Sequence, residues 1–184
     1  MTPTNDRMHS ASGRWAQLQP WLTTLARVAL GVVWIVAGAS KIADLSASVR
    51  AVRAYQLLPE SLVTVVGGAL PFAEIALGVL LVAGLGIRVV GVVSTLFLAA
   101  FVFGISQAWI RGLRIECGCF GGGGALGQGV APTYGREILR DVGLLVLAVF
   151  CLLFPRSAVS ADRALRKLVV GSDELAYTWR KDTE

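Results

Sequence analysis

Residues 89–110, with the sequence VVGVVSTLFLAAFVFGISQAWI, form a long run without a single charged side chain. The run before it, residues 61–87, contains one ionisable residue, Glu74. Stretches of about 18 or more apolar residues are long enough to cross the hydrocarbon core of a bilayer as a helix. Because Gly84-Leu85-Gly86 forms a short turn between the two runs, the sequence predicts an antiparallel pair of membrane-spanning helices.

The composition of the whole chain agrees with a membrane environment. Of its 184 residues, 55% are hydrophobic and only 16% are charged, whereas soluble domains carry about 25% charged residues. This composition excludes a soluble enzyme, a disordered tail and a disulfide-rich or collagen-like secreted fold. The net charge of +5 does not indicate nucleic-acid binding, because Lys and Arg lie in the gaps between apolar runs, where they usually flank membrane spans. We therefore expect the lipid bilayer as a partner and no nucleic acid.

Four spans are predicted, which gives an all-α integral membrane four-helix bundle with short amphipathic interfacial helices. The expected spans are residues 22–42, 62–83, 89–110 and 138–154, between a polar segment at 1–21 and a tail at 155–184. The first span is the weakest, because Arg27 and Lys41 interrupt it. A signal peptide competes there, with residues 28–36 as its apolar part and Ala37-Gly38-Ala39 as a small-residue cleavage site.

Four spans place both termini on one side of the membrane, and the distribution of Lys and Arg indicates which side. Basic residues near the span ends concentrate on the cytoplasmic side. The side with the termini carries Arg7, Arg14, Arg88, Arg156, Arg163, Arg166 and Lys167, against Arg50, Arg53, Arg111, Arg114 and Arg136 opposite. This bias predicts a multi-pass protein of the cytoplasmic membrane with cytoplasmic termini and a basic cytoplasmic tail.

Two segments outside the spans have helical periodicity. In the first outer loop the apolar positions are Leu45, Val49, Val52 and Tyr55, which predicts an amphipathic helix lying on the outer surface. In the tail, apolar positions at Ala161, Leu165, Leu168 and Val169 lie opposite a basic face suited to anionic cytoplasmic lipid.

The strongest chemical signal is Glu116-Cys117-Gly118-Cys119-Phe120-Gly121, which continues into further glycines in the second outer loop. Two cysteines can form a disulfide when their Cα atoms lie within about 7 Å, and residues two apart can meet that limit with strain. Strained and exposed disulfides are the ones that exchange readily. Arg111 and Arg114 nearby favour the thiolate, whereas Glu116 opposes it.

A disulfide that only holds the loop together and a metal site are the alternatives for this cysteine pair. A structural zinc site needs four ligands, and the only histidine, His9, is expected on the other side of the membrane. We therefore expect no metal. Cys151 lies deep in the fourth predicted span and is interpreted as a small buried apolar residue.

Ionisable residues inside the spans form the second signal, because they are costly in lipid and often functional. A rise of 1.5 Å per residue places Arg27 near the depth of Glu74, so Glu74 is expected to face the bundle interior with Arg27 or a polar group as its partner. By the same arithmetic Lys41 and Asp141 are expected to pair near the outer edge, close to the cysteine loop. Three roles are open: interhelical contacts that only stabilise the bundle, a proton or quinone path, and a transport site.

Six short motifs occur along the predicted membrane part of the chain, and their order and spacing together are specific. They are Arg27-x3-Gly31, Ala37-Gly38-x2-Lys41, Tyr55-x2-Leu58-Pro59, Pro71-x2-Glu74-x3-Gly78, Cys117-Gly118-Cys119-Phe120-Gly121 and Arg140-Asp141. Together they resemble the DoxX-like membrane family, and specifically its MauE branch, over about residues 22–154. The resemblance implies a four-helix membrane bundle that helps to form the disulfides of the methylamine dehydrogenase small subunit outside the cytoplasmic membrane. DoxX relatives are associated with oxidoreductases that pass electrons to quinone.

The function expected from these signals is disulfide exchange through Cys117 and Cys119 with an extracytoplasmic thiol protein or thioredoxin-like domain. If electrons continue onward, the resemblance implies a quinone as cofactor, beside Lys41, Arg140 and Asp141. A non-catalytic membrane scaffold for a redox enzyme is the alternative, and a small-solute transporter that uses Glu74 is a remote one.

Overall fold

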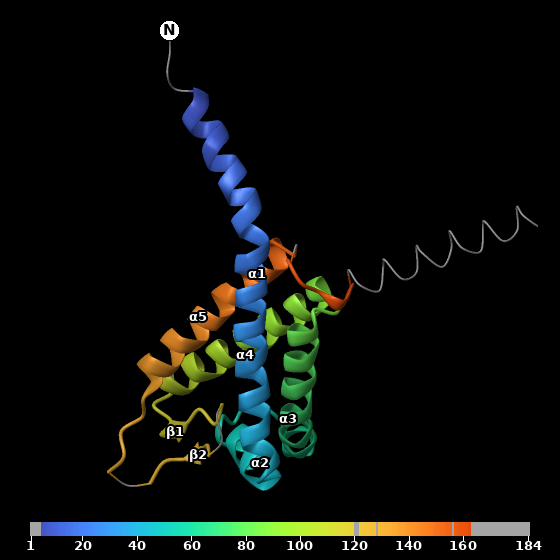
Figure 1. Ribbon diagram of the computed structural model, residues 1–184. Coiled ribbons are helices and arrows are strands. Elements are labelled where there is room, and N and C mark those ends of the chain that lie inside the picture. The colour runs from blue at the N-terminus through green and yellow to red at the C-terminus, as the bar shows by residue number, and fades with distance from the viewer. Residues whose placement is uncertain (1–4, 120–121, 128, 156, 163–184) are drawn as a thin grey trace, which may run out of the picture.

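The computed structural model describes residues 5–119, 122–127, 129–155 and 157–162 (Figure 1). Its elements are α1 (Asn5–Ile42), α2 (Leu45–Ala54), α3 (Glu60–Ala83), α4 (Ile87–Ile110), β1 (Ile115–Glu116), β2 (Gly124–Ala125) and α5 (Tyr134–Leu153). The prediction of a helical membrane protein is confirmed. The two short strands were not predicted.

Three of these helices are long and apolar enough to cross a membrane: α1 from Gln17 to Ile42, α3 and α4. Helix α5 packs against α4 and α1, but its first two turns carry Arg136, Glu137, Arg140 and Asp141. The three-helix part of the predicted bundle is therefore supported by length and composition. That α5 is a fourth span remains a prediction.

The ends of the chain continue the fold beyond the predicted spans. Helix α1 begins at Asn5, and the part of it that is long and apolar enough to cross a membrane begins at Gln17, so the predicted cytoplasmic segment 1–21 remains a prediction. The predicted basic amphipathic helix of the tail falls mostly on residues 163–184, outside the described residues. The last described segment, residues 157–162, turns back onto the helices: Ala158 N donates to Pro20 O at 3.1 Å, and Gly86 N donates to the carboxylate of Asp162 at 2.9 Å.

Helices α1 and α3 pack closely because small residues face each other. A Cβ added at Gly31 would lie 2.9 Å from the carbonyl oxygen of Gly78, and one added at Gly38 would lie 2.5 Å from that of Pro71. Glycine lets helix backbones approach in membranes in this way. These contacts bring the end of α1 beside the middle of α3, so the first turns of α3 extend beyond α1.

Helix α2 packs beside those first turns of α3, at the end of α1 (Figure 1). The hydroxyl of Ser48 donates to Gly67 O at 2.7 Å, and the buried residues of α2 are Ser48 and Ala51. The predicted helix therefore exists, and Val49, Val52 and Tyr55 of its predicted apolar face are half-buried. Leu45 is exposed, however, and the most buried residues of the helix are Ser48 and Ala51. Small residues are buried because α2 lies directly against protein backbone.

The main core lies between α1, α3, α4 and α5. It is formed by Leu30, Trp34, Leu77, Leu81, Val90, Leu98 and Ala148. The cysteine loop and α2 lie at one end of this core, and the turn between α3 and α4 lies at the other, together with residues 157–162 (Figure 1).

Candidate functional site

The candidate site is a loop that starts directly after β1. Cys117 and Cys119 form a disulfide, and their Cα atoms are 5.5 Å apart. Strands β1 and β2 pair antiparallel, with Ile115 opposite Ala125 and Glu116 opposite Gly124. The strand pair therefore holds the two ends of the loop together.

Helix α2 covers this loop through a contact that only small residues allow. Gly118 and Gly123 have φ angles of 73° and 88°, which favour glycine because a Cβ is strained in this left-handed region. A Cβ added at Gly118 would lie 2.8 Å from the Cβ of Ala51, and one added at Gly123 would lie 2.7 Å from it. The glycines thus serve the close approach of α2 as well as the tight loop.

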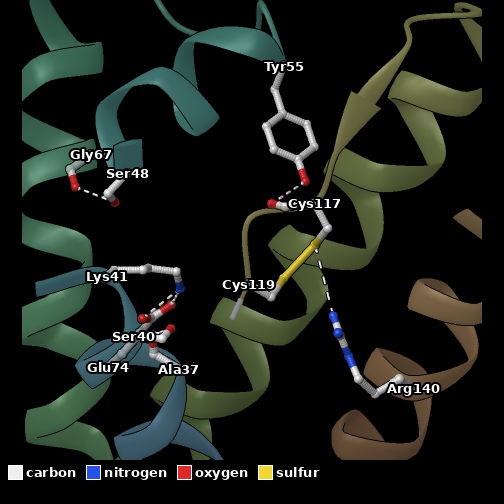
Figure 2. A network of polar contacts seen from close by, with 10 residues as sticks. All are labelled: Ala37, Ser40, Lys41, Ser48, Tyr55, Gly67, Glu74, Cys117, Cys119 and Arg140. Atoms are coloured by element: carbon white, nitrogen blue, oxygen red, sulfur yellow. Dashed lines mark hydrogen bonds and ion pairs between the residues drawn. A yellow bond between two sulfur atoms is a disulfide. The ribbon is translucent and has the colours of Figure 1, made fainter. Parts of the chain in front are cut away.

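Two tyrosines anchor the backbone around the cysteines. The hydroxyl of Tyr55, at the end of α2, donates to Cys117 O at 3.0 Å (Figure 2). Burial raises the pKa of Tyr55, so this hydroxyl stays protonated and remains a donor. Tyr134 at the start of α5 donates to Leu113 O and accepts from Ile115 N at 3.1 Å. Tyr55 was placed on an apolar helix face by its periodicity, and Tyr134 gave no signal in the sequence.

The two sulfur atoms have different surroundings. Cys117 is buried, with 8% of its surface exposed, whereas Cys119 is partly buried. The Nη2 atom of Arg140 lies 3.9 Å from Cys117 Sγ (Figure 2). A carboxylate oxygen of Asp141 lies within 4.8 Å of both sulfurs, and Arg140 Nε donates to Asp141 Oδ1 at 2.8 Å. Helix α5 therefore places one cation and one anion beside the disulfide.

The arginines near the cysteines in sequence have other partners. Arg111 donates to the side chain of Gln56 at 3.1 Å, and Arg114 donates to Val130 O at 2.7 Å. Glu116 accepts from Gly123 N at 3.4 Å. The cation beside Cys117 Sγ is instead Arg140, which was predicted as a site residue but beside a quinone.

The sulfurs of Cys117 and Cys119 and the carboxylate of Asp141 also form a group of possible metal ligands. Thiolates, and not disulfide sulfurs, are the metal-binding form of cysteine. In the disulfide form this group therefore offers a single ligand, the carboxylate, which is already paired with Arg140.

The buried charges pair differently from the prediction. Lys41 Nζ donates to both carboxylate oxygens of Glu74, at 2.6 and 2.8 Å (Figure 2). Arg27 donates to the carbonyl oxygens of Leu81, Val82 and Val159. Glu74 is buried inside the bundle with a polar partner, as predicted, but that partner is Lys41 and not Arg27, and the predicted pair Lys41–Asp141 is wrong.

The reason for this error is the register of α1 against α3. The depth arithmetic placed the inner ends of the first two spans at one level. In the structure Gly38 contacts Pro71 and Ile75, so Lys41 lies close to Glu74. At the other end Arg27 reaches the last turn of α3, where carbonyl groups lack helical partners.

Cys119 lines two small cavities. The first, with a volume of about 20 Å³, is lined by Trp34, Glu74, Cys119 and Asp141 among others. The second, of about 30 Å³, is lined by residues that include Lys41, Tyr55, Cys117 and Cys119. A cavity needs about 10–15 Å³ of such volume to hold one water. Each of these cavities therefore has room for one or two waters, and neither has room for the ring of a quinone.

Cys151 is a buried free cysteine, as predicted. It lies ten positions after Asp141 on α5, which corresponds to about 15 Å along the helix at 1.5 Å per residue. It therefore belongs to the core of the bundle and not to the cysteine loop.

The family model described as methylamine utilisation protein MauE matches residues 19–154. No curated protein and no solved structure matches the chain. The matched region contains α1 from Gln19 onward, the cysteine loop, and all of α5.

Proposed function

The chain belongs to the methylamine utilisation protein MauE family, and on this premise we propose that it exchanges a disulfide with a secreted thiol protein through Cys117 and Cys119. The family and the three long apolar helices indicate a multi-pass membrane protein associated with methylamine utilisation. The proposed partners are the thiols of a secreted enzyme such as the methylamine dehydrogenase small subunit.

The observation that carries this proposal is the asymmetry of the two sulfurs. Cys119 is the less buried residue of the pair, and Cys117 Sγ lies 3.9 Å from the guanidinium of Arg140. In thiol–disulfide exchange the better leaving sulfur is the one whose thiolate is more stable. A cation beside sulfur stabilises the thiolate. The partner therefore attacks Cys119, and Cys117 leaves.

The exchange balances as two successive displacements. A thiolate of the partner attacks Cys119 Sγ, a partner–Cys119 disulfide forms, and the electron pair of the broken bond goes to Cys117 Sγ. The second thiolate of the partner then attacks the partner sulfur of this mixed disulfide and releases Cys119 as a thiolate. The partner gains a disulfide, and Cys117 and Cys119 are reduced.

The pair is restored by the reverse exchange with the disulfide of a second protein, for which a thioredoxin-like domain is the proposed class. This route needs no quinone in the cavities beside Cys119, which fit only one or two waters. We place the cysteine loop outside the cytoplasmic membrane, because the Lys and Arg bias predicts cytoplasmic termini.

Trapping of the mixed disulfide tests the proposal. In Cys117→Ser the Cys119 thiolate can still attack the disulfide of the protein that restores the pair, but Cys117 is absent and cannot resolve the mixed disulfide, so a disulfide-linked complex should accumulate in cells. Cys119→Ser should trap much less, because Cys117 is buried. Cys151→Ala is the matched control and should oxidise the partner like the wild type, since Cys151 is buried far from the loop.

The outcomes separate the proposal from its rivals. Equal trapping by both loop variants would contradict the assigned order of attack. No trapping by either variant, with normal oxidation of the secreted partner, would contradict the exchange function. Labelling of Cys119 by a membrane-impermeant thiol reagent, after reduction of intact cells, tests the side of the membrane.

A non-catalytic scaffold is the second candidate, and one observation favours it. Cys117 belongs to a buried cluster with Ile105, Ala108, Ile115 and Tyr134, which is also what a structural disulfide would show. In that case the serine variants should lower the abundance of the chain equally and trap nothing. The pairing of Glu74 with Lys41 gives no support to transport through Glu74.

A further inference from the structure

Two buried polar atoms near the disulfide have no hydrogen-bond partner among the described residues: Trp34 Nε1 and Asp141 Oδ2. Trp34 is 3% exposed and Asp141 is 2% exposed. Unsatisfied buried polar groups cost free energy and often mark a catalytic role or a water-binding position. Both residues line the same cavity, together with Cys119 and Glu74.

The proposed exchange leaves one chemical problem at this position. Cys117 is the leaving sulfur in one direction and the attacking sulfur in the other, and it is buried. A buried thiol must lose its proton before it can attack, because the thiolate is the nucleophile. Direct transfer to bulk water is hindered by the loop and by Ala51 and Tyr55 of α2, which cover it.

We infer that Asp141 is the catalytic residue that accepts the proton of the Cys117 thiol and returns it when Cys117 leaves. This inference rests on the proposed function, since it assigns a residue to the same reaction. A carboxylate oxygen of Asp141 lies within 4.8 Å of both sulfurs, a distance that one cavity water can bridge. Asp141 Oδ1 is held by Arg140 at 2.8 Å, which leaves Oδ2 as the oxygen available for the proton.

The balanced step is the re-formation of the disulfide from the mixed disulfide. The Cys117 thiol transfers its proton to the carboxylate of Asp141. The thiolate attacks Cys119 Sγ, the Cys117–Cys119 bond forms, and the bond between Cys119 and the partner breaks. The electron pair leaves on the partner's sulfur, and Asp141 holds the proton.

The charges around Asp141 are arranged to keep the total charge of the site low. The groups that face it are Arg140 on α5, Lys41 on α1, Glu74 on α3, Tyr55 on α2 and the two cysteines of the loop. Helix α4 contributes the apolar side chains of Leu98 and Phe101 to the cavity. When Cys117 is a thiolate, a protonated Asp141 leaves one anion beside Arg140 in place of two.

The experiment uses the purified, reduced full-length chain and the small-molecule disulfide 4,4′-dithiodipyridine. Attack by Cys119 releases the first equivalent of pyridine thione, and attack by Cys117 on the resulting mixed disulfide releases the second. Asp141→Asn should leave the first phase unchanged and slow the second about a hundredfold at neutral pH, the lower end of usual general-base contributions. The slow phase should regain speed as pH rises, because hydroxide then takes the proton.

Three comparisons make the result decisive. Glu137→Gln removes a carboxylate one turn earlier on α5, where it accepts from Thr133 at 3.1 Å, and should leave both phases unchanged. Asp141→Glu keeps the carboxylate and should recover most of the second phase. If Asp141→Asn does not accumulate, the wild-type second phase should slow in D2O while the first does not.

Opposite outcomes overturn the inference. If Asp141 acted only as a negative charge, Asp141→Asn would increase the thiolate fraction of Cys117 and the second phase would become faster. An unchanged second phase, or one insensitive to D2O, also contradicts proton transfer by Asp141. The two proposals can fail separately, because the small-molecule probe replaces the protein partner. If Asp141→Asn slows the second phase but no partner is trapped in cells, the proposed function is refuted and the role of Asp141 stands.

Discussion

Lys41 Nζ lies 2.6 Å and 2.8 Å from the two carboxylate oxygens of Glu74, and both side chains are buried. This pair joins the end of α1 to the middle of α3. Breaking a buried ion pair on one side leaves an uncompensated charge, which costs about 3–5 kcal/mol in soluble proteins. Replacing both partners by apolar residues removes that penalty.

We therefore expect Lys41→Met and Glu74→Met each to lower the thermal unfolding midpoint in detergent strongly, and the double variant to be more stable than either. The contact between Arg53 and Glu60 is the matched control, since both side chains are exposed, and its loss should change the midpoint little. A double Lys41/Glu74 variant whose destabilisation equals the sum of the two single effects would contradict the pairing.

The second prediction concerns the cation beside the leaving sulfur. Arg140→Gln removes the charge 3.9 Å from Cys117 Sγ, so the Cys117 thiolate is less stable and leaves more slowly. We expect reduction of the oxidised chain by a small dithiol to slow roughly tenfold, which corresponds to about 1.4 kcal/mol in the barrier. The rate is measured by alkylating the released thiols at successive times.

Arg140→Lys keeps the charge but not the planar group that binds Asp141 and Cys117 together. Its rate should lie between those of the wild type and Arg140→Gln. Arg114→Gln, in the same loop but bonded to Val130 O, should react like the wild type. Equal rates for Arg140→Gln and the wild type would show that Arg140 does not stabilise the thiolate.

The sequence predicts the long apolar helices well, because a helix that crosses a bilayer needs a minimum apolar length, which can be counted directly in the sequence. Helices α3 and α4 begin within two residues of the predicted spans 62–83 and 89–110 and end at the same residues. The start of α1 was missed because the polar residues before the span continue the same helix. Hydropathy does not report a helix that extends beyond its apolar part.

The pairing of the buried charges could not be predicted, because it depends on how far one helix is shifted along another. Contacts at Gly31 and Gly38 fix that shift. A single sequence does not indicate which of its small residues face each other across two helices. The sequence did place Asp141 close to the cysteine loop, as the structure has it, but it did not indicate that Arg140 lies beside Cys117 Sγ. The hairpin of β1 and β2 was missed because two-residue strands have no detectable alternation.

The third prediction concerns Tyr55 and pH. Burial raises the pKa of Tyr55 above its usual value near 10, so its neutral hydroxyl, which donates to Cys117 O, contributes stability below about pH 10. That stability is lost as pH rises through the higher folded-state value. The ultraviolet difference spectrum between the wild type and Tyr55→Phe should therefore show ionisation of Tyr55 only well above pH 10.

Tyr55→Phe also removes the hydrogen bond to Cys117 O, and we expect it to destabilise the chain by about 1 kcal/mol at neutral pH. The difference in stability between the variant and the wild type should shrink at strongly alkaline pH, where the wild type also loses the bond. Ionisation of Tyr55 near pH 10, as in an exposed tyrosine, would contradict its burial against the loop.

The last prediction separates the two reasons for glycine at position 118. Gly112 and Gly118 have similar left-handed φ angles, 67° and 73°, but a Cβ at Gly112 would meet nothing within 4 Å, whereas one at Gly118 would lie 2.8 Å from Ala51 Cβ. Placing alanine in this backbone region costs about 1–2 kcal/mol. Gly112→Ala should show that cost alone, while Gly118→Ala should add the clash with α2, and should increase alkylation of reduced Cys119. Ala51→Gly makes room for the new Cβ. In the Ala51→Gly background, Gly118→Ala should therefore lower the free energy of unfolding by no more than Gly112→Ala does in the wild type. Equal costs for Gly112→Ala and Gly118→Ala would mean that α2 does not rest on the cysteine loop.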